Sequence, residues 1–197
     1  MLTLKDRVIN VPVMSLQTGA QIATTGEPII DPRYLRIHAF YCEGPQLDNN
    51  PSILHVDDIR EVSGLGFIVN SAEDLMSSED LVRLQEIINY NFKLDNKLVV
   101  DDTGHKIGHV GNYTIDTTTF YIVQINVTPG FWKSLATTEI PIHRRQIIEI
   151  TDTAIVVKSP TVKEEEAPAM LAPRPIVDNP FRHARPQADT ATQNEPK

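Results

Sequence analysis

The sequence has few of the features that mark secreted or membrane proteins. Its one cysteine among 197 residues, Cys42, excludes an internal disulfide framework. The longest apolar runs, such as Ile155-Val156-Val157, are far shorter than the ~20 residues that a membrane-spanning helix needs. The first residues lack a basic segment followed by an apolar stretch, so we predict no signal peptide and a cytoplasmic location. Apolar residues make up 41 % of the chain, which is enough for a packed core.

Positive charge is also scarce. The net charge is −8 and the isoelectric point is near 5.2, so the chain repels phosphate backbones and direct nucleic-acid binding is disfavoured. One local basic patch is formed by His143-Arg144-Arg145 together with Lys133. We interpret its arginines as solvated side chains at the start of a strand.

Motifs for catalysis and for ligand binding are missing as well. Residues 104–111 contain three glycines but fit neither the phosphate-binding loop nor the dinucleotide fingerprint. His105 and His109 have no third metal ligand nearby, and we predict that Cys42 is a buried residue in a strand. The sequence therefore predicts no catalytic residue, no cofactor, no metal and no enzyme activity. Two acidic pairs are interpreted as turn or strand-edge residues: Asp57-Asp58 and Asp101-Asp102.

The clearest positive feature is an internal repeat. From Val13 to Cys42 the chain matches residues 98–127 at a constant spacing of 85 positions, without a gap. Further on the spacing is 88, as if one loop of the second copy held three more residues. The matched residues are Thr18-Gly19 with Thr103-Gly104, Ile30-Asp31 with Ile115-Asp116, Ile37 with Ile122, Leu54 with Ile142, Glu61-Val62 with Glu149-Ile150, and 67–69 with 155–157.

Each copy has the pattern of β structure. In the second copy, a strand at 97–100 leads through a glycine-containing turn at 101–104 into a strand at 106–113. Residues 147–150 and 154–157 predict a closing hairpin.

A further strand shows alternating apolar and polar residues. From Tyr121 to Val127 every second residue is apolar, which predicts one buried face. In the first copy, Arg36 and His38 take the places of Tyr121 and Val123. A bulge is one way to restore the phase there.

The composition changes between the two copies and after the second. Residues 71–90 carry serines followed by acids, then leucines and isoleucines on one helical face, which predicts a short helix that packs on one β unit. Residues 159–197 hold seven of the fourteen prolines, which predicts a disordered tail. We therefore divide the chain into a first β unit (1–70), a helical linker (71–90), a second β unit (91–158) and the tail.

The second unit resembles the PRC-barrel family over about residues 96–158. The family shares a strand, a turn with glycine, an "Ile-Gly-x-Val" strand and an "Ile/Val-Asp" turn, which here are 98–104, 107–110 and Ile115-Asp116. The first unit has Ala23 where the second has Gly108, and we identify it as a degenerate copy through the internal alignment. The resemblance implies a mainly β fold of two tandem small barrels joined by a short helix.

What the resemblance implies about function is limited. Relatives include the cytoplasmic domain of the photosynthetic reaction-centre H subunit and the C-terminal domain of a ribosome maturation factor, whose barrels dock on other proteins. No catalytic motif is carried over to this chain. We therefore expect a non-enzymatic, protein-binding adaptor or assembly module. Two alternatives stay open: a ribosome-assembly or RNA-processing factor, and a peripheral component of a membrane complex.

Two segments carry candidate partner-binding residues. Phe131 and Trp132 lie beside the longer loop of the second copy, and exposed aromatics favour interfaces, although they could instead cap their own barrel. In the tail, Phe181 and Arg182 belong to a locally basic island at 179–186, as in short recognition segments, although chance composition explains it equally. Two weak contacts on one chain would raise avidity.

Overall fold

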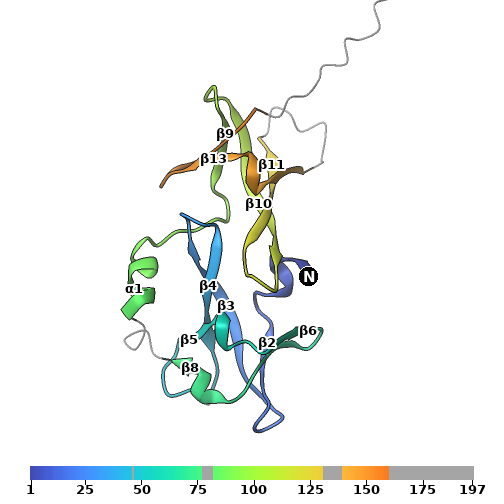
Figure 1. Cartoon of the computed structure of the whole chain (residues 1–197), viewed down its shortest axis with the longest axis vertical. Coiled ribbons are helices and arrows are strands. Elements are labelled where there is room, and N and C mark those ends of the chain that lie inside the picture. Colours follow the sequence, from blue (N-terminus) through green and yellow to red (C-terminus); the bar gives the residue numbers. More distant parts are fainter. Residues whose placement is uncertain (46, 77–81, 131–138, 160–197) are drawn as a thin grey trace, which may run out of the picture. The chain divides into compact units, whose positions relative to one another are not determined.

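Two sheets make up most of the structure. The computed structural model describes residues 1–45, 47–76, 82–130 and 139–159. The first sheet has the strand order β6-β7-β2-β3-β4-β5-β8, and the second has β12-β11-β10-β9-β14-β13 with β1 beside β10 (Figure 1). The predicted fold class, mainly β with two β units and a short connecting helix, is confirmed. The predicted disordered tail lies outside the described residues.

The first sheet is built around one long hairpin. Its central strands are joined by a turn at residues 32–35, and short strands extend the sheet on both sides. The strands are β2 (Pro12–Ser15), β3 (Gln21–Asp31), β4 (Arg36–Glu43), β5 (Ser52–His55), β6 (Glu61–Ser63), β7 (Gly66–Val69) and β8 (Leu75–Met76), with 3-10 helices η2 (Val56–Asp58) and η3 (Ala72–Asp74).

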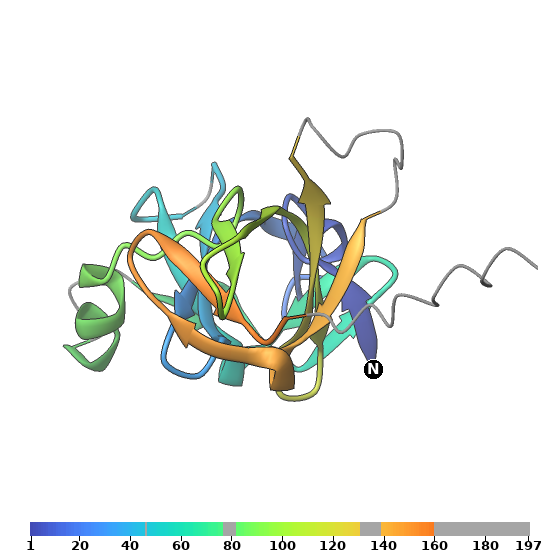
Figure 2. The ribbon, with the colours of Figure 1, turned by 90° about the horizontal axis from the view of Figure 1, so that it is seen from above.

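The second sheet has the same plan. A long central hairpin is again flanked by short strands, which curl round instead of lying flat (Figure 2). The strands are β1 (Leu2–Leu4), β9 (Leu98–Asp101), β10 (Lys106–Asp116), β11 (Ile122–Pro129), β12 (Ile140–His143), β13 (Ile147–Ile150) and β14 (Ala154–Val157), with 3-10 helices η1 (Lys5–Arg7) and η6 (Arg144–Gln146).

The strand registers of the structure show the same spacing as the sequence repeat. Ile30 pairs with Ile37 as Ile115 pairs with Ile122, which is a spacing of 85 on both strands. The spacing becomes 88 beyond the loops at 44–51 and 130–139, where Phe40 pairs with Leu54 and Ile125 with Ile142. The predicted insertion of three residues in the second copy therefore lies in the loop between β11 and β12.

The first strand of each unit departs from the predicted alignment. Val13 pairs with Ala23 and Phe67, whereas Val99 pairs with Gly108 and Ile155. These equivalent positions are 86 apart, so the gapless alignment from Val13 was wrong by one residue. The physical reason is the turn that follows, which is one residue shorter between β9 and β10 than between β2 and β3.

Both long hairpins contain bulges at matching places. The register shifts between Thr25 and Pro28 in β3 and between Val110 and Asn112 in β10. A second shift follows Ile29 in β3 and Thr114 in β10. Because the second bulge has its extra residue on β4 and on β11, a strict two-residue period cannot persist along either strand.

The predicted alternation from Tyr121 to Val127 is wrong for this reason. The buried residues of β11 are Ile122, Ile125 and Val127, while Tyr121 is half-buried. The equivalent residues of β4, namely Ile37, Phe40 and Cys42, are also buried. The apparent mismatch between the two copies therefore disappears, since the bulge is present in both.

The two hairpins meet each other reciprocally. The backbone amide of Ile37 donates to the carbonyl of Phe120 at 2.9 Å, and the amide of Ile122 donates to the carbonyl of Leu35 at 2.8 Å. Arg36 and Tyr121 form the bridge between these bonds. Arg36 and Tyr121 take equivalent positions in the two hairpins, and so do Ile37 and Ile122. The contact therefore has the form of a two-fold symmetric interface within one chain.

The N-terminal strand belongs to the second sheet. β1 pairs antiparallel with β10, with Leu2 opposite Asp116 and Leu4 opposite Thr114. The N-terminal ammonium group of Met1 lies 3.1 Å from Oδ1 of Asp116. The start of the predicted first unit (1–70) is therefore paired with the second sheet, which no local pattern indicated.

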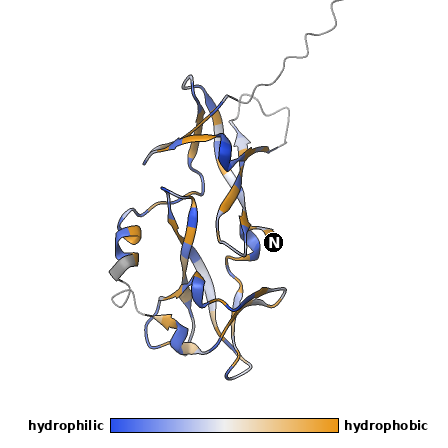
Figure 3. Ribbon diagram, viewed as in Figure 1, coloured by the Kyte–Doolittle hydropathy of each residue, from blue (hydrophilic) through white to orange (hydrophobic). Residues whose placement is uncertain are grey.

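One apolar core runs through both sheets. Most buried residues of the two sheets form one cluster, and a smaller second cluster lies on the first sheet. Apolar and polar stretches alternate along the strands (Figure 3). Phe120 of the second hairpin contacts Phe40 and Phe67 of the first sheet, with ring centroids 6.2 Å and 6.3 Å apart and nearly perpendicular rings. The two sheets therefore depend on each other for burial.

The connecting segment is helical for only part of its predicted length. Ser71 caps the 3-10 turn η3, but β8 follows and pairs with β5. Helix α1 (Val82–Asn89) comes later, and Leu84 and Ile87 pack on the first sheet. The predicted packing of its apolar face is confirmed, and the predicted helix start at 78–80 lies outside the described residues.

Candidate functional site

The four predicted partner-binding residues cannot be placed by the structure. Phe131, Trp132, Phe181 and Arg182 all lie outside the described residues. Their roles therefore stay predictions. The described part of the chain offers other sites.

One arginine of the predicted basic patch packs against the rest of the molecule, and Lys133 of that patch lies outside the described residues. The guanidinium of Arg144 lies 4.7 Å from the ring centroid of Tyr121, and its Nη2 donates to the backbone carbonyl of Tyr34 at 3.0 Å. Arg36 contacts the same ring at 5.8 Å. Arg144 begins a 3-10 helix and is half-buried, so its interpretation as a solvated residue at a strand start was wrong. Arg145 is exposed.

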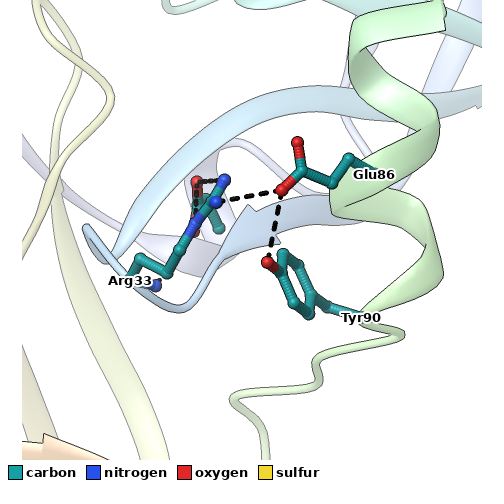
Figure 4. Close-up of polar contacts among 4 residues, drawn as sticks. Arg33, Glu86 and Tyr90 are labelled. Carbon is teal, nitrogen blue, oxygen red and sulfur yellow. Dashed lines mark hydrogen bonds and ion pairs between the residues drawn. The ribbon is translucent and has the colours of Figure 1, made fainter.

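An ionic cluster fixes helix α1 to the first hairpin. Arg33 Nη1 lies 3.1 Å from Oε1 of Glu86, and the Arg33 guanidinium lies 5.3 Å from the ring of Tyr90 (Figure 4). The Tyr90 hydroxyl donates to the same Glu86 oxygen at 3.4 Å. These contacts join two elements far apart in sequence and give the cluster a positioning role.

Asp31 is the buried member of this cluster. Its side chain is 2 % exposed and accepts hydrogen bonds from the backbone amide, Nε and Nη2 of Arg33. Burial raises the pKa of Asp31, but the hydrogen bonds from Arg33 outweigh it and hold the pKa below its ordinary value. His38 is close enough for its charge to interact with Asp31. Its side chain is half-buried, and its Nε2 has no hydrogen-bond partner among the described residues.

The side chain of Asp101 forms hydrogen bonds within the glycine-containing turn that follows it. Asp101 Oδ1 accepts from the amides of Thr103 and His105 at 2.9 Å and 2.8 Å. The hydrogen bond from the Thr103 hydroxyl, together with these amides, lowers the pKa of Asp101. His109 is exposed on β10. The predicted turn role of Asp101 is confirmed.

Cys42 has the environment of an inert thiol. It lies in β4 with no exposed surface, as predicted. Burial raises the pKa of its thiol to about 12, so it is protonated at neutral pH. Within the described ranges, no three His, Cys, Asp or Glu side chains are placed to hold a metal ion.

The edge strand β1 presents an apolar surface. Leu2 and Leu4 lie two residues apart on the strand and are 63 % and 44 % exposed. β1 pairs with β10 on one side and with no other strand in the described part of the chain. Sequence reasoning missed this surface because its place at a sheet edge depends on a long-range pairing.

The form of the second sheet indicates the class of domain to which it belongs. A bulged sheet that has a long central hairpin and curls round at its short outer strands has the form of a small β-barrel module. Residues 87–163 match the family model of the PRC-barrel domain, so this part of the chain is similar to that domain. No curated protein matches the chain. No described helix is long and apolar enough to cross a membrane.

Proposed function

We propose that this protein is a non-enzymatic adaptor that binds a protein partner through its PRC-barrel surfaces. The observation that carries this proposal is the exposed pair Leu2 and Leu4 on the free edge of β1. An edge strand offers unpaired backbone groups, and apolar side chains beside them add contact area for an extended segment of a partner. Phe131 and Trp132 stay candidates for a separate partner contact, and the tail around Phe181 and Arg182 for a weak further one.

We also propose that the first sheet is a degenerate copy of the PRC-barrel domain. Its strand order and its hairpin registers repeat those of the second sheet at constant spacing. The reciprocal bonds of Ile37 and Ile122 support an origin by duplication, since they have the form of a symmetric dimer contact.

Affinity capture from native lysate tests the adaptor role. The full chain is compared with the double variant Leu2→Asp/Leu4→Asp, which places charge on the edge of β1. The matched control is Leu16→Asp/Leu65→Asp, because these leucines are 63 % and 71 % exposed in turns between strands of the first sheet. We expect the full chain and the control variant to capture a stoichiometric partner. The β1 variant should capture at least about tenfold less of that partner.

Two outcomes would contradict this proposal. The absence of any stoichiometric partner would remove its main support, and equal capture by both double variants would exclude β1. In the second case, Trp132→Ala and a chain shortened to end at Lys158 would assign recognition to the longer loop or to the tail.

A further inference from the structure

The 3-10 helix η6 of the second sheet carries positive charge without a carboxylate partner. Arg145 is exposed, and its side chain forms no ion pair or hydrogen bond with a described residue. Arg144 donates to the carbonyl of Tyr34 at 3.0 Å but pairs with no carboxylate in the described ranges. The exposed Lys158 adjoins the end of η6, where its backbone amide donates to the carbonyl of Gln146 at 2.8 Å. This region therefore has positive charge available for a ligand.

The equivalent turn of the first sheet, η2, has the opposite charge. Both turns are capped by a histidine whose Nδ1 accepts from a backbone amide, His55 in η2 and His143 in η6. At the spacing of 88, the equivalent of Arg145 is Asp57. Asp57 is paired, since its Oδ1 lies 3.5 Å from Nη2 of Arg36. Because η2 has the same form with an acid in this place, the turn does not require the positive charge of η6.

Two exposed side chains with large apolar surfaces belong to the same region. Ile148 lies on the edge strand β13, three residues after Arg145, and is 53 % exposed. Tyr34, whose carbonyl Arg144 reaches, is 58 % exposed. In the first sheet, the place of Ile148 is taken by Arg60. Exposed tyrosine and arginine next to an aliphatic side chain are typical of protein–protein interfaces.

These side chains together favour a carboxylate-bearing segment of a protein as the ligand. A guanidinium group binds a carboxylate through two parallel hydrogen bonds, which gives such pairs strength and direction. Glu149, the acid nearest to Arg145 in sequence, is exposed and forms no ion pair with a described residue. A nucleic acid is disfavoured, because the net charge of −8 repels a chain of phosphates.

We propose that η6 and the neighbouring Ile148 form a docking surface for an acidic segment of a protein partner. Carboxylates of the segment accept hydrogen bonds from Arg145 and from the remaining donors of Arg144, and an apolar side chain of the segment covers Ile148. The surface contains no residue of β1. It rests on the proposed adaptor role and adds the chemistry of a partner. A synthetic probe tests it, so its failure is distinguishable from a failure of the β1 edge.

NMR titration of the isotope-labelled full chain with the peptide acetyl-Glu-Glu-Leu-Glu-Glu-amide tests the proposal. We expect saturable shifts of the η6 amides, and none with the peptide that has glutamine in place of each glutamate. Arg145→Asp, which copies Asp57, should weaken binding at least about tenfold, because it replaces attraction by repulsion. Arg7→Asp is the matched control, since Arg7 is an exposed arginine of the 3-10 helix η1 and its change alters the net charge equally. It should leave the affinity unchanged.

A second variant tests the apolar part of the surface. Ile148→Ser should weaken peptide binding about threefold through lost apolar contact. Leu65→Ser is its control, because Leu65 is 71 % exposed in a turn of the first sheet. Thermal unfolding checks that each variant is folded. Equal affinity of Arg145→Asp and Arg7→Asp would overturn the proposal, and so would the absence of saturable shifts at η6. An RNA oligonucleotide that bound η6 as tightly as the acidic peptide would also contradict it.

Discussion

The two sheets of this protein share their backbone plan and differ in the chemistry that supports it. Strand order, bulges and the pairing of the long hairpins are the same in both. Yet Thr25 is replaced by Val110, and the aromatic Phe120 has Leu35 as its equivalent. The comparison teaches that a register can persist while side chains change, provided that each change is compensated by a neighbour.

One such compensation is visible where two strands approach closely. In the second sheet, a side chain at Gly108 would collide with the carbonyl oxygen of Thr128, and residue 129 opposite is proline. In the first sheet, the equivalent of Gly108 is Ala23, and the residue facing it is Gly44, where a side chain would meet the backbone of Ile22. The glycine therefore lies on the opposite strand of the pair in the first sheet, and the two backbones still approach each other closely.

The largest effect is expected at Phe120, which carries the second hairpin into the core of the first sheet. Phe120→Ala removes the contacts with Phe40 and Phe67 and leaves a cavity, so the free energy of unfolding should fall by about 3–5 kcal/mol. Phe120→Leu, which copies Leu35, should cost less. Urea unfolding measures both, and equal losses would show that aromatic packing is unimportant here.

The next effect sharpens the glycine comparison. Gly108→Ala should lower the free energy of unfolding by about 2–3 kcal/mol, because the added methyl group meets backbone that cannot move freely. Gly44→Ala should have a similar cost in the other sheet. Gly64→Ala is the control, since nothing lies within 4 Å of its added methyl group. An unchanged midpoint for Gly108→Ala would contradict the close approach.

Asp31 and its equivalent Asp116 differ in burial and should differ in pH dependence. Asp31→Asn should cost about 2 kcal/mol at pH 7, the range for hydrogen bonds to a charged group. Because the folded-state pKa of Asp31 lies below its unfolded value of about 3.9, its contribution is complete above that pH and is lost as pH falls through the folded pKa.

Chemical denaturation between pH 3 and pH 7 measures how the free energy of unfolding of each variant depends on pH. The difference in free energy of unfolding between Asp31→Asn and the parent chain should shrink toward the acidic end. Asp116→Asn should show a smaller loss, since Asp116 is 28 % exposed and accepts from an exposed terminal ammonium group. A constant difference at all pH values would contradict the role of the Asp31 carboxylate.

The smallest effect concerns Thr25 and Val110. The Thr25 hydroxyl donates to the carbonyl of Val8 at 2.9 Å and accepts from the amide of Val11 at 3.0 Å. Thr25→Val, which copies Val110, should cost about 1–2 kcal/mol because it leaves these groups unpaired. Val110→Thr is the reverse exchange, and it should also destabilise by burying a hydroxyl. Thermal unfolding that showed either change to be neutral would contradict this account.

Local signals in the sequence were sufficient for much of the fold. The spacing of 85 and then 88 predicted which strands pair alike, since turns and apolar residues recur at those intervals. The apolar face of Leu84 and Ile87 predicted helix packing correctly. The phase of β11 could not be predicted, because a bulge depends on the partner strand and not on the alternation of one strand.

The sequence by itself determined the β class, the repeated hairpins, the buried Cys42 and the turn role of Asp101. Each of these depends on residues close together in the chain, whose spacing limits what the backbone can do. Only the tertiary structure decided that β1 joins the second sheet and that the two long hairpins meet at Arg36 and Tyr121. Both depend on contacts between residues about 85 or more apart in the chain, which no periodicity records.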